Sequence, residues 1–169
     1  LQYHKFTGGT WERLIHPYQL RQYNNRWFLV GWEPAVAAKI PLVVIPLDRI
    51  DDYKILDKEH FVSYQGDIDE CFKDIVGVSL RFKEPCQHIV FKAYHPTSSY
   101  IETKPIHHSQ RAVERYEDYT IFSLDLIPNY EFETIMMSYV DNCDVLEPQE
   151  LKESLVKRAK NIIKFNYAQ

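Results

Sequence analysis

Short strand-like runs, separated by turn residues, follow one another through the first sixty residues of the chain. Residues 18–23 and 26–32 are two such runs, joined by Asn24-Asn25. Because asparagine tolerates a positive φ, an Asn-Asn pair suits a two-residue hairpin turn. The apolar run of residues 40–50 contains prolines, which indicate an edge position in a sheet. Several short strands with frequent turns predict a small β-barrel or sandwich.

The remainder of the chain changes to a mixed rhythm after a polar segment at residues 54–70. We expect strands at 75–82, 100–108, 119–127 and 143–146. We expect helices at 84–94, after Asn129 as N-cap and after Pro148. The order is therefore β-α-β-β-α-β, followed by a last helix. That order is typical of a ferredoxin-like layout. The predicted fold class is therefore β plus α/β, with a small β-barrel followed by a ferredoxin-like α+β domain that ends in a C-terminal helix. The predicted domains are 1–60 and 75–169, joined by a linker at 61–74.

Composition excludes several classes of protein. Aromatic residues make up 14% of the chain, which is too many for a disordered tail. The most apolar stretch, residues 28–47, holds two charges and three prolines, so it cannot be a spanning helix. The three cysteines, which include no C-x-x-C pair, favour free thiols in a reducing cytosol. We therefore expect a cytoplasmic protein with no membrane partner.

Charge is unevenly distributed along the chain. Residues 1–50 hold six basic and three acidic side chains, a balance of +3, whereas the whole chain carries a formal charge of −4. The remaining residues therefore carry −7. A positive β module ahead of an acidic α/β module suggests that the first half meets an anion.

The predicted hairpin groups charged and aromatic residues on one face. A two-residue turn places Tyr23 opposite Arg26, and strand alternation then puts four side chains together: Arg21, Tyr23, Arg26 and Phe28. The other face is expected to be the core face: Tyr18, Leu20, Trp27 and Leu29. Guanidinium groups bind phosphate and aromatic rings stack on bases, so the first face is a candidate ligand site. The alternative is a solvated face whose arginines lie over neighbouring rings.

Three segments of the first half carry a family resemblance: His16-Pro17-Tyr18-Gln19-Leu20, the run from Tyr23 to Gly31, and Ile45-Pro46-Leu47-Asp48-Arg49-Ile50. In this order they resemble the WYL domain, which is named for a Trp-Tyr-Leu triplet. The triplet here is Trp27-Phe28-Leu29, so the tyrosine hydroxyl is missing. The second half resembles the C-terminal extension that often follows a WYL domain, including a Val145-Leu146-Glu147-Pro148 step before the last helix.

The resemblance implies a fold, a function and partners. WYL domains are similar to Sm-type or SH3-like barrels and usually follow a winged helix-turn-helix in bacterial transcription regulators. They are thought to sense nucleic-acid or nucleotide ligands, including single-stranded DNA. The basic pocket of the family maps onto Arg26 and Arg49, with His16 and Tyr18 as further candidates; Arg21 and Tyr23 join them from the hairpin face. We therefore expect an effector-sensing fragment that controls DNA binding through a helix-turn-helix domain absent from this sequence, and that forms a homodimer through the extension.

Other functions are weaker candidates. No catalytic motif is present, so we expect no enzyme, no catalytic residues, no cofactor and no metal. His107 and His108 are candidates for a metal or anion site at a strand end, but adjacent strand residues point to opposite faces, so we do not expect both to bind one metal ion. The alternative function is a dimerisation or interaction scaffold without a small ligand.

Overall fold

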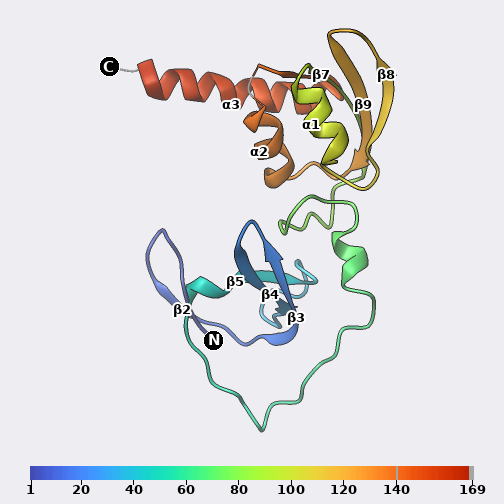
Figure 1. Cartoon of the computed structure of the whole chain (residues 1–169). Helices are drawn as coiled ribbons and strands as arrows, with labels where there is room; N and C mark the ends of the chain where they lie inside the picture. Colours follow the sequence, from blue (N-terminus) through green and yellow to red (C-terminus); the bar gives the residue numbers. More distant parts are fainter. Residues whose placement is uncertain (140, 168–169) are drawn as a thin grey trace. The chain divides into compact units, whose positions relative to one another are not determined.

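The computed structural model describes residues 1–139 and 141–167. The chain forms two compact units, Leu1–Lys73 and Asp74–Gln169. Within the described residues, the first unit contains two three-stranded antiparallel sheets and two short 3-10 helices, and the second contains one four-stranded antiparallel sheet and three α-helices. Figure 1 shows their arrangement within each unit. The structure thus confirms a mixed β and α/β class with a C-terminal helix.

The first unit divides its strands between two sheets. The first sheet has the order β3-β4-β5, with β3 at His16–Tyr23, β4 at Arg26–Trp32 and β5 at Val43–Pro46. The second sheet has the order β2-β1-β6, with β1 at Gln2–His4, β2 at Thr10–Glu12 and β6 at Ile50–Asp52. The helix η1, Leu47–Arg49, separates β5 from β6, so the predicted run at 40–50 supplies one strand to each sheet. Among the described strands no pairing joins the two sheets, so a closed barrel is not confirmed.

Both sheets pack on a shared apolar core. Tyr3 of β1 and Val43 and Ile45 of β5 are buried together, and partly buried side chains surround them, including Ile15 and Leu29. Because one sheet supplies Tyr3 and the other supplies the aliphatic residues, burial holds the sheets together although no ladder joins them.

The predicted hairpin is confirmed in turn and register. Asn24 and Asn25 have φ values of 47° and 60°, and Tyr23 lies opposite Arg26 and Arg21 opposite Phe28. Both asparagines therefore adopt the left-handed conformation that a tight hairpin turn requires.

The predicted core face of the hairpin is only partly right. Leu29 packs on the core, but Leu20 and Trp27 are 55% and 48% exposed, and Val30 on the opposite face is fully buried. The reason is position in the sheet: β3 is an edge strand, and the pairing of β5 ends at Phe28, so the tip of the hairpin has no neighbour there. How deeply a hairpin side chain is buried therefore depends more on its distance from the turn than on the face of the sheet from which it projects.

The second unit has the strand order β10-β7-β9-β8. Its elements are β7 Gln87–Tyr94, α1 Thr97–Thr103, β8 Arg111–Arg115, β9 Tyr119–Leu126, α2 Tyr130–Ser138, β10 Cys143–Glu147 and α3 Gln149–Tyr167. Chain order is therefore β-α-β-β-α-β-α, as expected. Helices α1 and α2 lie along one side of the sheet (Figure 1).

Three elements of that order lie on other residues than predicted. Residues 75–82 form turns, 84–94 contain β7 in place of a helix, and 100–108 contain the end of α1 in place of a strand. In β7 the alternate residues Ile89 and Phe91 are fully buried, which is the period of a strand. Pro85 suits the first turn of a helix, which favours a helix at 84–94 from the sequence alone. The structure follows the strand alternation instead.

Asn129 ties the start of α2 to the turns before β7. Its Oδ1 accepts a hydrogen bond from the Phe132 backbone N–H at 3.0 Å, as predicted for an N-cap. Its Nδ2 donates to the carbonyl oxygens of Val76 at 2.6 Å and Ser79 at 3.2 Å. The side chain is buried, so one amide satisfies a helix end and two loop carbonyls.

We predict that Asn129→Ala lowers the free energy of unfolding of the second unit by about 2–3 kcal/mol, since it removes a cap and leaves buried carbonyls unpaired. Urea unfolding measures this. Asn161→Ala, on the exposed part of α3, is the control and should change stability little. Equal losses for both variants would contradict the locking role of Asn129.

The connection after β6 generates a second prediction. Residues 53–60 lack regular structure and are all exposed, whereas the following residues are bonded to β3. Exposed irregular segments are preferred cleavage sites. Limited proteolysis followed by mass spectrometry should therefore give a first cut within 53–60; a first cut within 18–32 would contradict this division.

Candidate anion-binding site

Arg49 is the least compensated of the arginines proposed to bind a ligand. It ends η1, donates from Nη1 to the Tyr3 hydroxyl oxygen at 3.2 Å, and lies 3.8 Å from the centroid of the Phe6 ring. Its Nε is buried and has no hydrogen-bond partner in the described part of the chain. Both contacts are to neutral groups, so the guanidinium keeps an unneutralised charge and an unused donor.

Arg26 reaches the same short helix through a carboxylate. It begins β4, and its Nη2 lies 3.2 Å from Oδ2 of Asp48, the residue before Arg49. Both side chains of this ion pair are nearly half exposed. The structure thus brings both predicted arginines to η1 but gives them different partners: Arg26 is paired with a carboxylate, and Arg49 is not.

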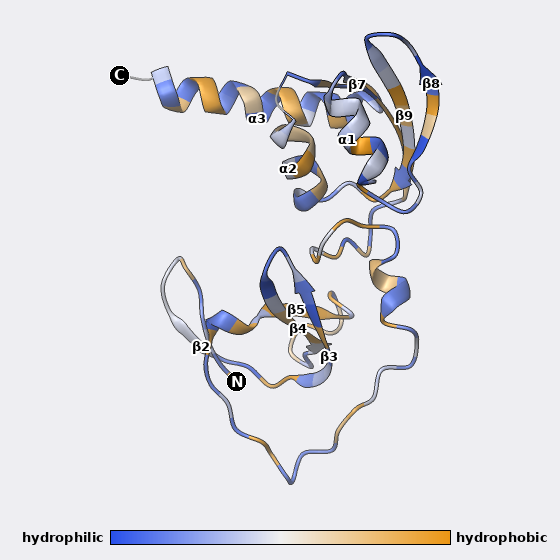
Figure 2. Cartoon of the chain, in the orientation of Figure 1, coloured by the Kyte–Doolittle hydropathy of each residue, from blue (hydrophilic) through white to orange (hydrophobic). Residues whose placement is uncertain are grey.

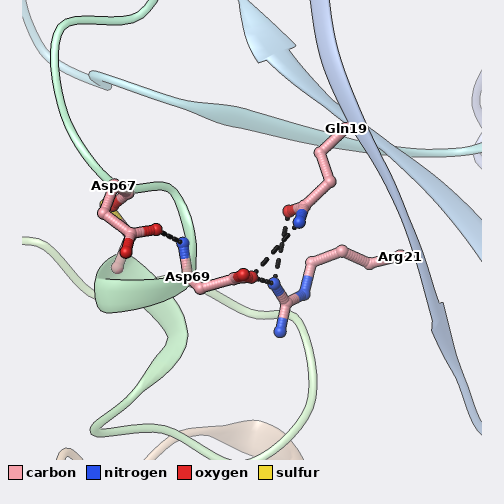
Figure 3. Close-up of polar contacts among 5 residues, drawn as sticks. Gln19, Arg21, Asp67 and Asp69 are labelled. Atoms are coloured by element: carbon pink, nitrogen blue, oxygen red, sulfur yellow. Dashed lines mark hydrogen bonds and ion pairs between the residues drawn. The ribbon is translucent and has the colours of Figure 1, made fainter.

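Arg21 is bound by an acidic residue of the segment that was predicted to be a linker. Its Nη1 and the Nε2 of Gln19 both donate to Oδ1 of Asp69, at 2.5 and 3.2 Å (Figure 3). The guanidinium also lies 4.0 Å from the ring centroid of Phe72. The hydrogen bonds from Gln19 and Arg21 lower the pKa of the Asp69 carboxyl.

His16 and Tyr18 use their polar atoms to hold the chain after residue 60. The backbone N–H of Val62 donates to His16 Nδ1 at 3.0 Å, and the Tyr18 hydroxyl donates to the Val62 carbonyl oxygen at 2.9 Å. Phe61 contacts both rings, and burial raises the pKa of Tyr18. These contacts give the two residues a structural role in the first unit.

Tyr23 lies directly across the turn from Arg26, on the predicted face of the hairpin. It is half-buried. The predicted grouping of Arg21, Tyr23, Arg26 and Phe28 is thus present in the strand pairing.

The positive balance of the first fifty residues does not extend to the whole unit. Residues 51–73 contain three basic and seven acidic side chains, so residues 1–73 together carry nine basic and ten acidic groups, or −1. The sequence analysis did not identify Asp69 as a partner of the hairpin. The available signal was the acidic group Asp67, Asp69 and Glu70, which lies within the predicted linker at 61–74.

A cleft of about 720 Å³ lies elsewhere in the first unit. Residues 1–2, 12–17, 52–56 and 59–61 line it. Of the six predicted ligand-binding residues, His16 is the one that belongs to this described lining. The cleft and the arginines around η1 are therefore different features of the unit.

The two adjacent histidines do not behave as strand residues. His107 and His108 lie in a turn, and their ring centroids are 4.1 Å apart, so the expectation that they point to opposite faces is wrong. His107 Nδ1 is 2.7 Å from the hydroxyl oxygen of Ser109. A search of the described residues finds no group of three or more His, Cys, Asp or Glu side chains that could hold a metal ion.

The cysteines are free thiols in the structure. Burial raises the pKa of Cys143 to about 12, and the hydrogen bond between Tyr64 and Cys71 raises the pKa of the tyrosine to about 12. A raised pKa keeps Cys143 protonated at neutral pH, which makes it a poor nucleophile.

None of the described helices combines the length and the hydropathy that crossing a membrane would require.

Comparisons with known proteins find two families in the chain. The model of the WYL domain matches residues 1–55, and the model of the WCX domain matches residues 78–163. Among solved structures, the chain is similar to proteasome accessory factor B/C (PafBC) of Arthrobacter aurescens, with 18% sequence identity and a TM-score of 0.44. The similarity covers 99% of this chain and 25% of PafBC, so the chain spans a quarter of that protein's length. No curated protein matches the chain.

Proposed function

The chain belongs to the family of proteins in which a WYL domain is followed by a WCX domain, and on this basis we propose that it is the effector-sensing part of a transcription regulator. The effector is a nucleotide or a single-stranded nucleic acid, bound through Arg49 and Arg26 with Arg21 and Tyr23 beside them. Binding of the effector controls DNA binding by a helix-turn-helix domain of the full-length protein. The role is binding, without catalysis and without a cofactor.

The observation that carries this proposal is the unneutralised guanidinium of Arg49. A buried donor without a partner is unusual in a folded protein and needs an explanation, such as a bound ion or ligand. A phosphate group accepts hydrogen bonds from a guanidinium fork and supplies the missing negative charge. The site therefore fits a phosphate better than a neutral ligand.

An aromatic ring beside this guanidinium favours a nucleotide over inorganic phosphate. The Phe6 ring lies against Arg49 and is 69% exposed. Exposed rings next to cationic groups bind single-stranded nucleic acids by stacking on the bases. Phosphate and base recognition then lie side by side, at η1 and at the turn after β1 that carries Phe6.

Two structural predictions accompany this function. We infer that the two sheets of the first unit correspond to the Sm-like or SH3-like barrel that the family resemblance implies, since they share one core. The domain boundaries 1–60 and 75–169 stay a prediction. Residues 61–64 and Asp69 nevertheless bind β3, so the proposed linker at 61–74 is partly docked on the first domain.

The C-terminal helix suits a contact between two copies of the chain. Leu151 of α3 is buried, but every described residue of α3 from Ala159 onward is exposed. These residues include Ile162, Ile163 and Phe165, with exposed fractions of 53%, 59% and 78%. Figure 2 shows apolar residues along the helix as far as its projecting end. A partner that covers the second half of α3 would bury these apolar side chains.

A scaffold without a small ligand is the second candidate function, and the exposed face of α3 favours it. Both candidates share the dimer. They differ in whether the arginines bind an anion, so the two experiments below separate them.

For the ligand site, we predict that Arg26→Gln with Arg49→Gln weakens binding of a short single-stranded oligonucleotide. Loss of two phosphate contacts should flatten the slope of log K against log salt by about 1.4. Fluorescence anisotropy across a salt series measures both quantities. Lys39→Gln with Lys58→Gln is the matched control, because it removes two exposed charges from the same unit. A slope reduced equally by both double variants would contradict a specific site.

For the dimer, we predict that the chain self-associates and that Ile162→Glu raises the dissociation constant by about tenfold or more, since a carboxylate would be buried without a partner. Sedimentation velocity over a concentration series measures it. Asn161→Glu adds the same charge at the neighbouring position and serves as the control. A chain that stays monomeric at the highest concentration would exclude α3 as the dimer contact and leave the ligand proposal standing.

A further inference from the structure

The Asp69 carboxylate occupies a position in which an anion would bind. Its Oδ1 receives hydrogen bonds from Gln19 and Arg21, two side chains on the same face of β3 (Figure 3). Gln19 Oε1 also accepts from Arg21 Nη1 at 3.3 Å, which orients the guanidinium toward the carboxylate. One face of the guanidinium lies over the buried ring of Phe72. The guanidinium of Arg21 is therefore already oriented to bind an anion before any ligand arrives.

The carboxylate comes from a short helix that presents it outward. Helix η2, Asp69–Phe72, begins with the Asp69 backbone N–H donating to Oδ1 of Asp67 at 2.8 Å. Phe72 at the other end of η2 is buried, while the side chain of Asp69 is 68% exposed. The helix is thus anchored by its phenylalanine, and the aspartate side chain can rotate away from Arg21 without moving the helix.

The pair that Asp69 forms is easily exchanged. Ion pairs in which one partner is exposed contribute little to stability, because water solvates the separated charges. A phosphate can accept two parallel hydrogen bonds from a guanidinium, whereas Asp69 accepts a single one from Arg21 through Oδ1. An anionic ligand arriving at β3 therefore competes with a weak internal occupant.

We propose that Asp69 is an internal competitor for the effector: its carboxylate takes the position of a phosphate on Gln19 and Arg21 and must be displaced when a phosphate-bearing ligand binds. This inference rests on the proposed function, because it adds Gln19 beside Arg21 to the proposed phosphate-binding surface and makes a carboxylate of the same chain lower the affinity of that surface. Asp69 lowers the affinity for every anion and thereby favours ligands that present several phosphates.

The test compares Asp69→Asn with Asp57→Asn in the full chain. Asparagine keeps an oxygen acceptor for Gln19 and Arg21 but has no charge, whereas Asp57 is an exposed aspartate in the same acidic segment. We expect Asp69→Asn to bind a short oligothymidylate two- to fivefold more tightly than Asp57→Asn does at the same salt concentration. Adding Arg21→Ala to both variants should abolish the difference between them.

A spectroscopic readout in the wild-type chain is independent of any substitution. The carbon-13 shift of the Asp69 carboxyl reports its titration. When the oligonucleotide saturates the protein, the carboxyl loses the hydrogen bonds from Gln19 and Arg21, so its lowered pKa should rise toward the ordinary value. A pKa that stays unchanged on saturation would overturn the inference.

The outcomes separate this inference from the proposed function. If the wild type binds the oligonucleotide and Asp69→Asn binds no more tightly than Asp57→Asn, Asp69 is not a competitor and the proposed function stands. If the difference persists without Arg21, the competitor mechanism is also wrong. If neither the wild type nor Asp69→Asn binds the oligonucleotide or pyrophosphate at low salt, both proposals fail. Binding by Asp69→Asn alone supports both.

Discussion

The left-handed conformations of Asn24 and Asn25 determine the register of the β3–β4 hairpin, and the positions of the arginines follow from that register. With a two-residue turn, Arg26 becomes the first residue of β4. Phe28 of the same strand pairs with Pro46, the last residue of β5. Helix η1 begins at the next residue, Leu47, so it lies close to the start of β4. A shift of one residue in the turn would move each side chain of β4 to the opposite face and separate Arg26 from Asp48.

Each arginine of the proposed surface has a different electrostatic environment. Arg26 forms an ion pair with Asp48, and Arg21 forms one with Asp69. The carboxylates of both aspartates are exposed. Arg49 has the Tyr3 hydroxyl and the Phe6 ring, which provide hydrogen bonding and packing but no opposite charge. The two carboxylates offset the charges of Arg26 and Arg21, and the unit as a whole is close to neutral.

The second unit is built in a different way. Its sheet buries alternate residues such as Phe91 and Phe122, whose rings stack at a centroid distance of 5.3 Å. Asn129 joins α2 to the turns before β7, so the sheet, the helix and the turns form one body. The projecting half of α3 is the exception, because it extends past the core that buries Leu151. The exposed second half of α3 is the part of this unit that we propose contacts a second copy of the chain.

The sequence by itself determined the local features whose causes are local. The Asn24-Asn25 turn, the register across it, the Asn129 cap and the β-α-β-β-α-β-α order all depend on backbone preferences or on patterns within a few residues. The residues that form the first three of these elements differ from the prediction, because Pro85 favours a helix at 84–94 and the alternation of β7 favours a strand. Tertiary structure alone decided which carboxylate neutralises which arginine. Asp69 is 48 residues from Arg21, and Arg49 is 46 residues from Tyr3. Such contacts depend on how the chain returns after β6, and no periodicity in the sequence encodes that path. The same holds for the exposure of Leu20 and Trp27, because burial at the hairpin tip depends on where a neighbouring strand ends.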